Sequence, residues 1–422
     1  MSTIDNLLDP IVIPRMVRVK QRFERPVIHD VVGEFKKKIA QRNVMAELKP
    51  GQRIAIGVGS RGIANLPAIV KALVAEFRNA RAEPFLVPAM GSHGGGTAEG
   101  QRDTLIRMGC SEEYVGAPIL ATMDAVKVGV AANGLPVFFD KNALTADATV
   151  FINRIKPHTA FRGPYESGLL KFIAIGLGKH KGAVICHDLG FEAMAENIPA
   201  IARVSLARTN ILFAVGLVEN AYHETCRVEV LRNNEIEAKE PALQVEAKRL
   251  CAKIYFGEFD VLVVDQMGKD ISGPGIDPNV IGRHHTRLCS GGPSVNRIAV
   301  LDVTDKSHGN VNGIGIADVT TRRLFDKISF EHTYPNALTS TLPSGTRIPM
   351  VMNNDKQALQ ACIRTCNRLN KEDVTVVRIK NTLALDEIEI SENLGVCARQ
   401  IKYVEPCGSP YDLSFDAAGN LF

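Results

Sequence analysis

The segment 154–187 combines ionisable and apolar residues in an unusual way. It reads RIKPHTAFRGPYESGLLKFIAIGLGKHKGAVICH and carries His158, His180 and His187 together with several lysines in a Gly-rich, apolar frame. A surface linker would be more polar, so we expect much of this segment to be buried. Histidine is the commonest acid or base near neutral pH and a common metal ligand. These residue types predict acid–base or metal chemistry in a buried site.

Lys171 lies in the most apolar part of this segment, LLKFIAIGL. A lysine with Leu, Phe and Ile neighbours is either desolvated for covalent chemistry or extends its ammonium group to solvent, and both readings stay open. His187 stands in AVICHD, beside a cysteine and an aspartate. That mixed setting suits a soft metal ion, and a structural histidine is the alternative for His187 and for His180.

Two Gly-rich loops earlier in the chain carry further candidates. GVGSRGIAN contains Ser60 and Arg61 just before a helical pattern, where Arg61 could clamp a phosphate or carboxylate. A tight turn with a solvated Arg61 is the alternative. GSHGGGTAEG places His93 among glycines, which leave its imidazole within reach of a ligand. His93 is therefore a candidate acid or base, with a plain surface histidine as the alternative.

The second half of the chain has one comparable loop, DQMGKDISGPGIDPN. It carries Lys269, Asp270 and Asp277, with glycines that allow the backbone to approach a ligand. We expect Lys269 and Asp270 to contact the substrate.

The expected strands and helices put these loops at the carboxyl ends of strands. Continuous apolar runs bounded by Gly-rich turns are typical of buried parallel strands. The pattern predicts a strand, loop and helix over 53–77, a strand at 84–88 with a helix from about 97, strands at 148–153, 210–218, 259–265, 296–303 and 374–380, and helices at 191–206, 240–255, 320–328 and 355–369. Ligands of open parallel sheets bind beyond the carboxyl ends of the strands.

This alternation predicts an α/β fold of two domains with mainly parallel sheets and an active site in the cleft between them. A chain of 422 residues is too long for one ordinary core. We place an N-terminal α/β domain with the cofactor and catalytic residues at 1–255 and a C-terminal α/β domain that closes the cleft at 256–405. The tail, 406–422, is expected to pack back on the N-terminal domain.

Composition narrows the class of partner. Lys plus Arg 50 against Asp plus Glu 46 leaves a net charge of +4, too small for a nucleic-acid surface and compatible with a small anionic ligand. No apolar run approaches the ~18 residues of a membrane span, so a cytoplasmic protein is expected. The 9 cysteines show no CxxC spacing, and Cys362 and Cys366 are expected to be core residues. A homo-oligomer is left open.

Taken in order, these residues resemble the lactate racemase family, the nickel-pincer nucleotide enzymes. In that family a Thr-Arg pair, a Gly-x-His, a Pro-His, a lysine and a third histidine follow one another. The matching positions are Ser60 and Arg61, then His93, His158, Lys171 and His187. The resemblance implies that Lys171 holds the pyridinium cofactor by a thioamide link, aided by Ser60 and Arg61, that His187 coordinates nickel, and that His93 and His158 are the acid and base.

The chemistry that the resemblance implies is inversion of the C2 centre of a 2-hydroxy acid. One histidine takes the hydroxyl proton while hydride leaves C2 for the pyridinium ring, and return of hydride to the other face inverts the centre. Two faces require two acid–base groups on opposite sides. The ionisable groups of 154–187 would then line a closed cofactor pocket.

Two departures from the family pattern bear on the details. The family's lysine segment is a Gly-Gly-Arg-Lys run closer to its histidine, whereas this chain has ESGLLK and a longer gap. Lys269 and Asp270 are followed by ISGPGIDPNVIGRHH, unlike typical members. We therefore expect a substrate larger or more polar than lactate. The rival hypotheses are a non-pincer enzyme of the same fold, either a dehydratase or an oxidoreductase, and a sugar-acid-binding protein.

Overall fold

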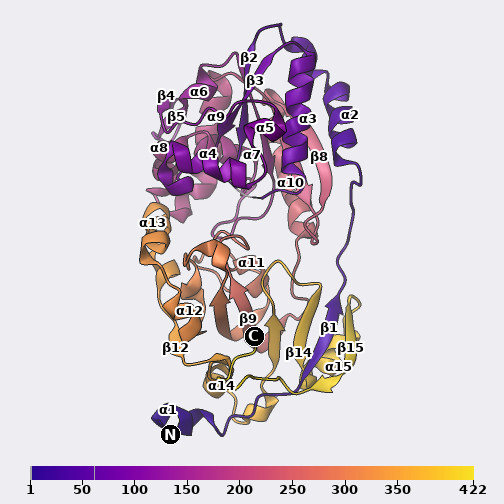
Figure 1. The fold of residues 1–422 in the computed structure, drawn as a ribbon, viewed down its shortest axis with the longest axis vertical. Helices are drawn as coiled ribbons and strands as arrows, with labels where there is room; N and C mark the ends of the chain where they lie inside the picture. The colour runs from indigo at the N-terminus through magenta and orange to yellow at the C-terminus, as the bar shows by residue number, and fades with distance from the viewer. Residues whose placement is uncertain (1, 61) are drawn as a thin grey trace. The chain divides into compact units, whose positions relative to one another are not determined.

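The computed structural model describes residues 2–60 and 62–422 and divides into two compact units. Glu24–Cys251 forms one, here called the N-terminal unit. The segment up to Phe23 and Ala252–Phe422 form the other, here called the C-terminal unit. Each unit has its own sheet flanked by helices (Figure 1). The chain is therefore an α/β protein with mainly parallel sheets, as the sequence predicts.

A five-stranded sheet with the order β3-β2-β6-β7-β8 forms the centre of the N-terminal unit. The strands from β3 to β7 are parallel, and β8 runs antiparallel to β7. Their bounds are β2 (Arg53–Val58), β3 (Glu83–Pro88), β6 (Ala148–Arg154), β7 (Ile211–Glu219) and β8 (Thr225–Arg232). The carboxyl ends of β3, β2 and β6 are therefore neighbours at one edge of the sheet.

Helices and a small hairpin surround this sheet. They are α2 (Val31–Arg42), α3 (Leu66–Asn79), α4 (Ala98–Arg107), α5 (Glu112–Val115), β4 (Ala125–Val130), β5 (Pro136–Asp140), α6 (Lys141–Leu144), α8 (Lys179–His187), α9 (Met194–Arg208) and α10 (Asn233–Leu250). The helices α2 and α3 cover one face, where Phe35 and Leu73 share a fully buried core with Ile56 of β2. Apolar side chains recur on α3 at helical spacing, which is why this helix buries a continuous stripe.

The aromatic ring of Phe172 packs against the opposite face of the sheet. The short helix α7 (Leu169–Lys171) leads directly into a π-helical turn, η3 (Phe172–Gly176). The Phe172 ring stacks on Phe151 of β6 with 4.8 Å between ring centroids. Gly57 of β2 makes room, because a Cβ atom there would lie 3.1 Å from a ring carbon of Phe172. This contact anchors Lys171, the preceding residue, close to the sheet.

The sheet of the C-terminal unit has eight strands in the order β12-β11-β10-β9-β13-β14-β1-β15. Strands β12 to β13 in this order are parallel, and β14, β1 and β15 continue antiparallel. The bounds are β1 (Met16–Gln21), β9 (Glu258–Met267), β10 (Ser294–Val303), β11 (Val319–Thr321), β12 (Met350–Met352), β13 (Val376–Ile379), β14 (Glu387–Ser391) and β15 (Val404–Tyr411). The helices are α1 (Thr3–Leu8), α11 (Pro278–Ile281), α12 (Arg322–Asp326), α13 (Phe330–Ser340), α14 (Asp355–Thr365) and α15 (Gly395–Gln400).

Cys362 and Cys366 lie in the core between α14 and this sheet, which confirms their assignment as core residues. The chain's C-terminus packs in the same place. Phe415 and Leu421 contact that core, and the backbone N–H of Leu421 donates to a carboxylate oxygen of Asp355 at 2.8 Å.

The division into units differs from the predicted domains at both ends of the chain. The segment up to Phe23 belongs to the C-terminal unit, not to a domain of 1–255, because β1 pairs with β14 on one side and β15 on the other. The tail 406–422 belongs there too, because part of it is β15 and the rest packs on α14.

Candidate active site

Three loops that leave neighbouring parallel strands carry the predicted acid–base and cofactor residues. Ser60 follows β2, His93 follows β3 and His158 follows β6. Because the carboxyl ends of parallel strands meet at one edge of a sheet, these loops share the edge where ligands of such sheets bind.

The structure brings Ser60 and His93 into direct contact. The Ser60 Oγ lies 2.5 Å from the Nδ1 of His93. The turn around His93 depends on Gly94, which has a φ of +67° and whose Cβ, if present, would lie 2.7 Å from the backbone nitrogen of Gln101. Arg61, the predicted clamp for an anionic group, lies outside the described residues.

A buried carboxylate organises the loop after β6. Glu166 accepts hydrogen bonds from the backbone N–H groups of His158 at 2.8 Å and Gly163 at 3.2 Å. Its charge is compensated by Lys248 at 2.5 Å and by Arg162 at 3.7 Å. Sequence reasoning missed Glu166. The available signal was an acidic residue inside a Gly- and Pro-rich stretch that is otherwise expected to be buried.

A backbone hydrogen bond and two aromatic rings hold the imidazole of His158. The backbone N–H of Ala160 donates to Nδ1 at 3.1 Å, so a neutral ring carries its proton on Nε2. The rings of Phe161 and Phe191 lie 4.4 and 5.9 Å from it, centroid to centroid. Burial, and then the charge of Lys171, hold the pKa of His158 well below its usual range. His158 is therefore neutral near pH 7.

Lys171 sits at the end of α7, whose first turn is capped by a second buried carboxylate. The Glu240 oxygens accept from the backbone N–H groups of Leu169 at 3.0 Å and Leu170 at 2.8 Å. Gly168 lets them approach, because a Cβ there would lie 1.9 Å from Glu240 Oε1. Burial raises the pKa of Glu240 to about 7. Glu240 was also missed, because 69 residues separate it from Lys171 and only the fold joins them.

His187 and Lys171 belong to the same electrostatic cluster as His158. Burial is the main cause that lowers the pKa of His187, and the positive charge of Lys171 lowers it further. The same charge acts on His158. Phe191 packs between the two histidines, edge-on to the His187 ring with 5.7 Å between centroids. The structure thus gathers His158, Lys171 and His187, as the sequence pattern suggested.

The His187 ring is oriented by its own helix. Its Nδ1 lies 2.7 Å from the carbonyl oxygen of Ala183, which can only accept, so Nδ1 carries a proton. In the neutral ring the lone pair is then on Nε2. Metal-ligating histidines are commonly oriented in this way, with the second ring nitrogen donating to a carbonyl. His180, the alternative ligand, is exposed on α8.

The other predicted substrate contacts lie in the C-terminal unit, in the loop after β9. Lys269 donates from Nζ to the carbonyl oxygen of Gly273, and Asp270 accepts from Thr304 Oγ1 at 2.6 Å. Both residues follow the carboxyl end of a parallel strand, which is the position expected of a ligand-binding loop.

The fold is similar to that of a lactate racemase. The structure matches that of the lactate racemase apoprotein from Thermoanaerobacterium thermosaccharolyticum with a TM-score of 0.52. The match covers 88% of this chain and 99% of that chain, at 12% sequence identity. At that identity the likeness shows the fold alone. No family profile and no curated protein matches the sequence.

Side chains of the described residues form no cluster of three or more His, Cys, Asp or Glu able to hold a metal ion. Among the same residues, no helix combines the length and the apolar character that a membrane span requires.

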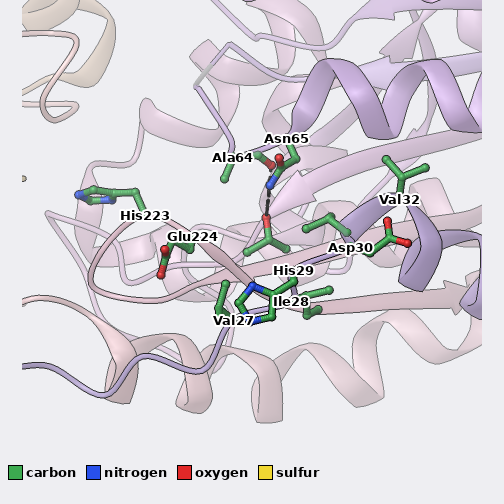
Figure 2. Close-up of a pocket in the computed structure, with 11 residues that line it drawn as sticks. Val27, Ile28, His29, Asp30, Val32, Ala64, Asn65, His223 and Glu224 are labelled. Atoms are coloured by element: carbon green, nitrogen blue, oxygen red, sulfur yellow. Dashed lines mark hydrogen bonds between the residues drawn. The ribbon is translucent and has the colours of Figure 1, made fainter.

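A pocket of about 500 Å³ lies elsewhere at the same edge of the N-terminal unit's sheet. Figure 2 shows its lining, which includes His29, Asn65, His223 and Glu224. None of the predicted site residues in the described part of the chain lines it. Ala64, one of its lining residues, donates from its backbone N–H to Glu219 at the end of β7. Its lining includes no lysine and neither of the two phenylalanine rings that lie close to His158.

Proposed function

We propose that this chain is a racemase or epimerase that inverts the C2 centre of a 2-hydroxy acid with a lysine-bound nickel-pincer nucleotide. One observation carries the proposal. The Ser60–His93 pair and the cluster of His158, Lys171 and His187 occupy one edge of a parallel sheet in a fold similar to that of a lactate racemase. The order of these residues along the chain is also that of the lactate racemase family.

The chain's own residues fit such a cofactor. His187 donates from Nδ1 to Ala183, which leaves the Nε2 lone pair of the neutral ring for a metal ion. The half-buried Lys171 lies close enough for its charge to act on His187. In this proposal Lys171 holds the pyridinium and His187 coordinates nickel. When bound, the cofactor supplies a pyridinium ring that can accept and return hydride.

His93 and His158 are proposed to serve as the acid–base pair. Ser60 holds Nδ1 of His93, so the Nε2 of His93 is the atom that exchanges a proton with the substrate hydroxyl. Ala160 donates to Nδ1 of His158, so the Nε2 of His158 holds the proton of the neutral ring. A neutral imidazole can take a proton and becomes an acid once it is protonated, so each turnover needs one neutral ring and one protonated ring. Positioned on different loops, they can serve the two faces of C2.

The substrate is proposed to be longer or more polar than lactate, with Lys269 and Asp270 among its contacts. Other polar side chains of that loop already have structural roles. Asp277 caps α11, and Arg283 pairs with Asp318 at 2.6 Å. Lys269 and Asp270 also have partners within the chain, so this part of the proposal rests on the polar character of the loop, which suits a polyhydroxylated or dicarboxylic acid better than a methyl group. A clear preference for lactate over malate, 2-hydroxyglutarate and gluconate would contradict this part of the proposal.

Intact-protein mass measurement tests the assignment of Lys171. The protein is expressed together with the proteins that synthesise the pincer cofactor, and we expect a nucleotide-sized covalent adduct. Lys171→Ala should abolish the adduct, because the attachment nitrogen is removed. Lys181→Ala is the matched control: this lysine is exposed on α8 and should leave the adduct in place. An adduct that survives Lys171→Ala would remove Lys171 from this role.

The rival functions predict different results in the same samples. A non-pincer enzyme of this fold would convert a hydroxy acid without any adduct. A sugar-acid-binding protein would bind its ligand reversibly and invert nothing.

A further inference from the structure

Lys179, at the start of α8, is buried in a way that is unusual for a lysine. Its side chain has no exposed surface, and its backbone adopts a left-handed φ of +58°. A buried ammonium group is costly unless it is fully hydrogen-bonded, and a positive φ is uncommon for residues other than glycine. Such costs persist only where the surrounding structure enforces them, and they gather at functional sites.

Three acceptors surround the Lys179 ammonium group. Its Nζ donates to the carbonyl oxygen of Pro88 at 2.7 Å and to Oε1 of Gln101 at 2.5 Å. The Asp140 carboxylate lies 3.5 Å away and is itself fully buried. Two hydrogen bonds and an ion pair therefore hold the ammonium group, and Asp140 carries the compensating charge.

Gln101 of α4 connects Lys179 to the loop that carries His93. Its Nε2 donates to the carbonyl oxygens of Gly91 at 2.9 Å and His93 at 3.1 Å. The ammonium group of Lys179 can only donate, so the amide oxygen of Gln101 must face it. That constraint turns the amide NH₂ group toward the loop. Lys179 thus fixes the orientation of the Gln101 amide group.

Together the two side chains hold the whole turn from β3 to His93. Lys179 binds the carbonyl of Pro88, the last residue of β3, and Gln101 binds those of Gly91 and His93. The imidazole of His93 then meets Ser60. Lys179 and Gln101 are both fully buried on helices, so the turn is held in place by two rigid elements.

We propose that Lys179, acting through Gln101, is a positioning residue that sets the place of the His93 imidazole for proton transfer. The proposal rests on the proposed function, in which His93 exchanges a proton with the substrate. It also excludes Lys179 as the cofactor's attachment point, because its ammonium group is fully buried and committed to two hydrogen bonds and an ion pair.

Two variants break the network at different points. Lys179→Met removes the donor while keeping an unbranched side chain. Gln101→Glu keeps an oxygen toward Lys179 and places a second carboxylate near it besides Asp140, but turns a second acceptor toward the carbonyls of Gly91 and His93. Gln101→Glu therefore tests the proposal even if Lys179→Met does not fold. Lys181→Met, two residues further along α8 and exposed, is the matched control.

Hydrogen exchange followed by mass spectrometry measures how firmly the loop is held, without relying on activity. We expect the peptide 89–97 to exchange about tenfold faster in Lys179→Met and Gln101→Glu, with exchange in β7 unchanged, because only the loop loses its anchors. In the cofactor-loaded enzyme kcat should fall about 100-fold while KM changes little, since a misplaced base affects the chemical step. Lys181→Met should change neither quantity.

The outcomes separate this proposal from the proposed function. Unchanged loop exchange in Gln101→Glu, or a rise in KM with kcat unchanged, would overturn the positioning role. If the loaded wild-type protein inverts no hydroxy acid, the proposed function fails. Loop exchange in the two variants then still decides whether Lys179 and Gln101 position His93.

Discussion

The imidazole of His158 is held in one protonation state by its surroundings. The Ala160 N–H points at Nδ1, and a second proton there would oppose it. Burial and the charge of Lys171 act in the same direction on the pKa of His158. A neutral ring with a defined tautomer can take part in proton transfer near pH 7 without first losing a proton to solvent.

Replacing either of the two histidines proposed as the acid–base pair should suppress inversion. We expect His93→Ala and His158→Ala each to lower kcat by about 10²–10⁴-fold, because each removes a positioned proton carrier. His180→Ala, an exposed histidine on α8, should leave kcat within about twofold of the wild type. Chiral chromatography of a 2-hydroxy acid incubated with each loaded variant measures the effect. Normal inversion in one variant would remove that histidine from the mechanism.

His187 should be needed for metal and not for folding. His187→Ala should lose bound nickel, because the proposed protein ligand is removed, while the covalent adduct on Lys171 remains. Elemental analysis of the purified protein measures nickel per chain, and circular dichroism checks the fold. His180→Ala again serves as the control and should retain nickel. Retention of nickel in His187→Ala together with its loss in His180→Ala would reassign the ligand to His180.

Single residues were predictable where their type is rare and their setting unusual. Histidines among glycines or beside proline, and Lys171 among apolar residues, stand out in the sequence. Glu166 and Glu240 do not, because an isolated glutamate resembles any solvated surface residue until the fold buries it. Both accept hydrogen bonds from backbone N–H groups, which carry no sequence signal.

Among the elements, α7 is unusual because a distant helix provides its cap. Glu240 of α10 accepts from the first residues of α7, and the stacking of Phe172 on Phe151 holds the turn that follows. Lys171 lies between these two anchors. The ionisation state of Glu240 therefore bears on the stability of the segment that carries Lys171.

The free energy of unfolding should depend on pH through Glu240. Burial raises its pKa in the folded protein to about 7, against 4.5 for an ordinary glutamate. Between these two pH values the folded state binds more protons than the unfolded state. The stabilisation that Glu240 contributes is therefore complete below about pH 4.5 and is lost as pH rises through about 7. The loss is on the order of 3 kcal/mol.

Urea unfolding of the wild type and of Glu240→Gln at pH 5 and pH 8 tests this contribution. In the variant the free energy of unfolding should fall much less from pH 5 to pH 8 than in the wild type, because glutamine does not titrate. Glu237→Gln, on the same helix but partly exposed and paired with Arg203, is the control and should follow the wild type. Identical pH dependence in wild type and Glu240→Gln would show that Glu240 does not titrate in this range.

Elements with a single strong pattern were predicted well, and those that depend on distant partners were not. The buried parallel strands β2, β3, β6, β7, β9, β10 and β13 are confirmed, because a strand covered on both faces is a continuous apolar run. The helix predicted at 240–255 is wrong at both ends, since α10 spans Asn233–Leu250. Pro241 is typical of a first helical turn and suggests a start there, but it lies inside α10.

The antiparallel strands of the C-terminal unit were missed for a related reason. β1, β14 and β15 alternate buried and exposed residues or are largely exposed, and polar or charged side chains interrupt their apolar pattern. Their pairing joins residues from the two ends of the chain. A local pattern cannot indicate such a partner.

At the scale of the whole molecule, two α/β units each present loops at the carboxyl ends of parallel strands. The N-terminal unit carries the histidines and Lys171, and the C-terminal unit carries Lys269 and Asp270. The predicted location of the substrate between the units stays a prediction. The likeness to a lactate racemase covers 88% of the chain and so includes parts of both units.

In the proposed function C2 is inverted by removal and return of hydride, and a deuterium label at C2 distinguishes this route from inversion by proton loss. The cofactor-loaded protein is incubated in ordinary water with one enantiomer of a 2-hydroxy acid deuterated at C2, and the opposite enantiomer is isolated and analysed by mass spectrometry. We predict that the inverted product retains its deuterium, because hydride does not exchange with water during transfer. Inverted product that has lost the label to solvent would rule out hydride transfer, since it would mean that C2 is inverted through loss of a proton.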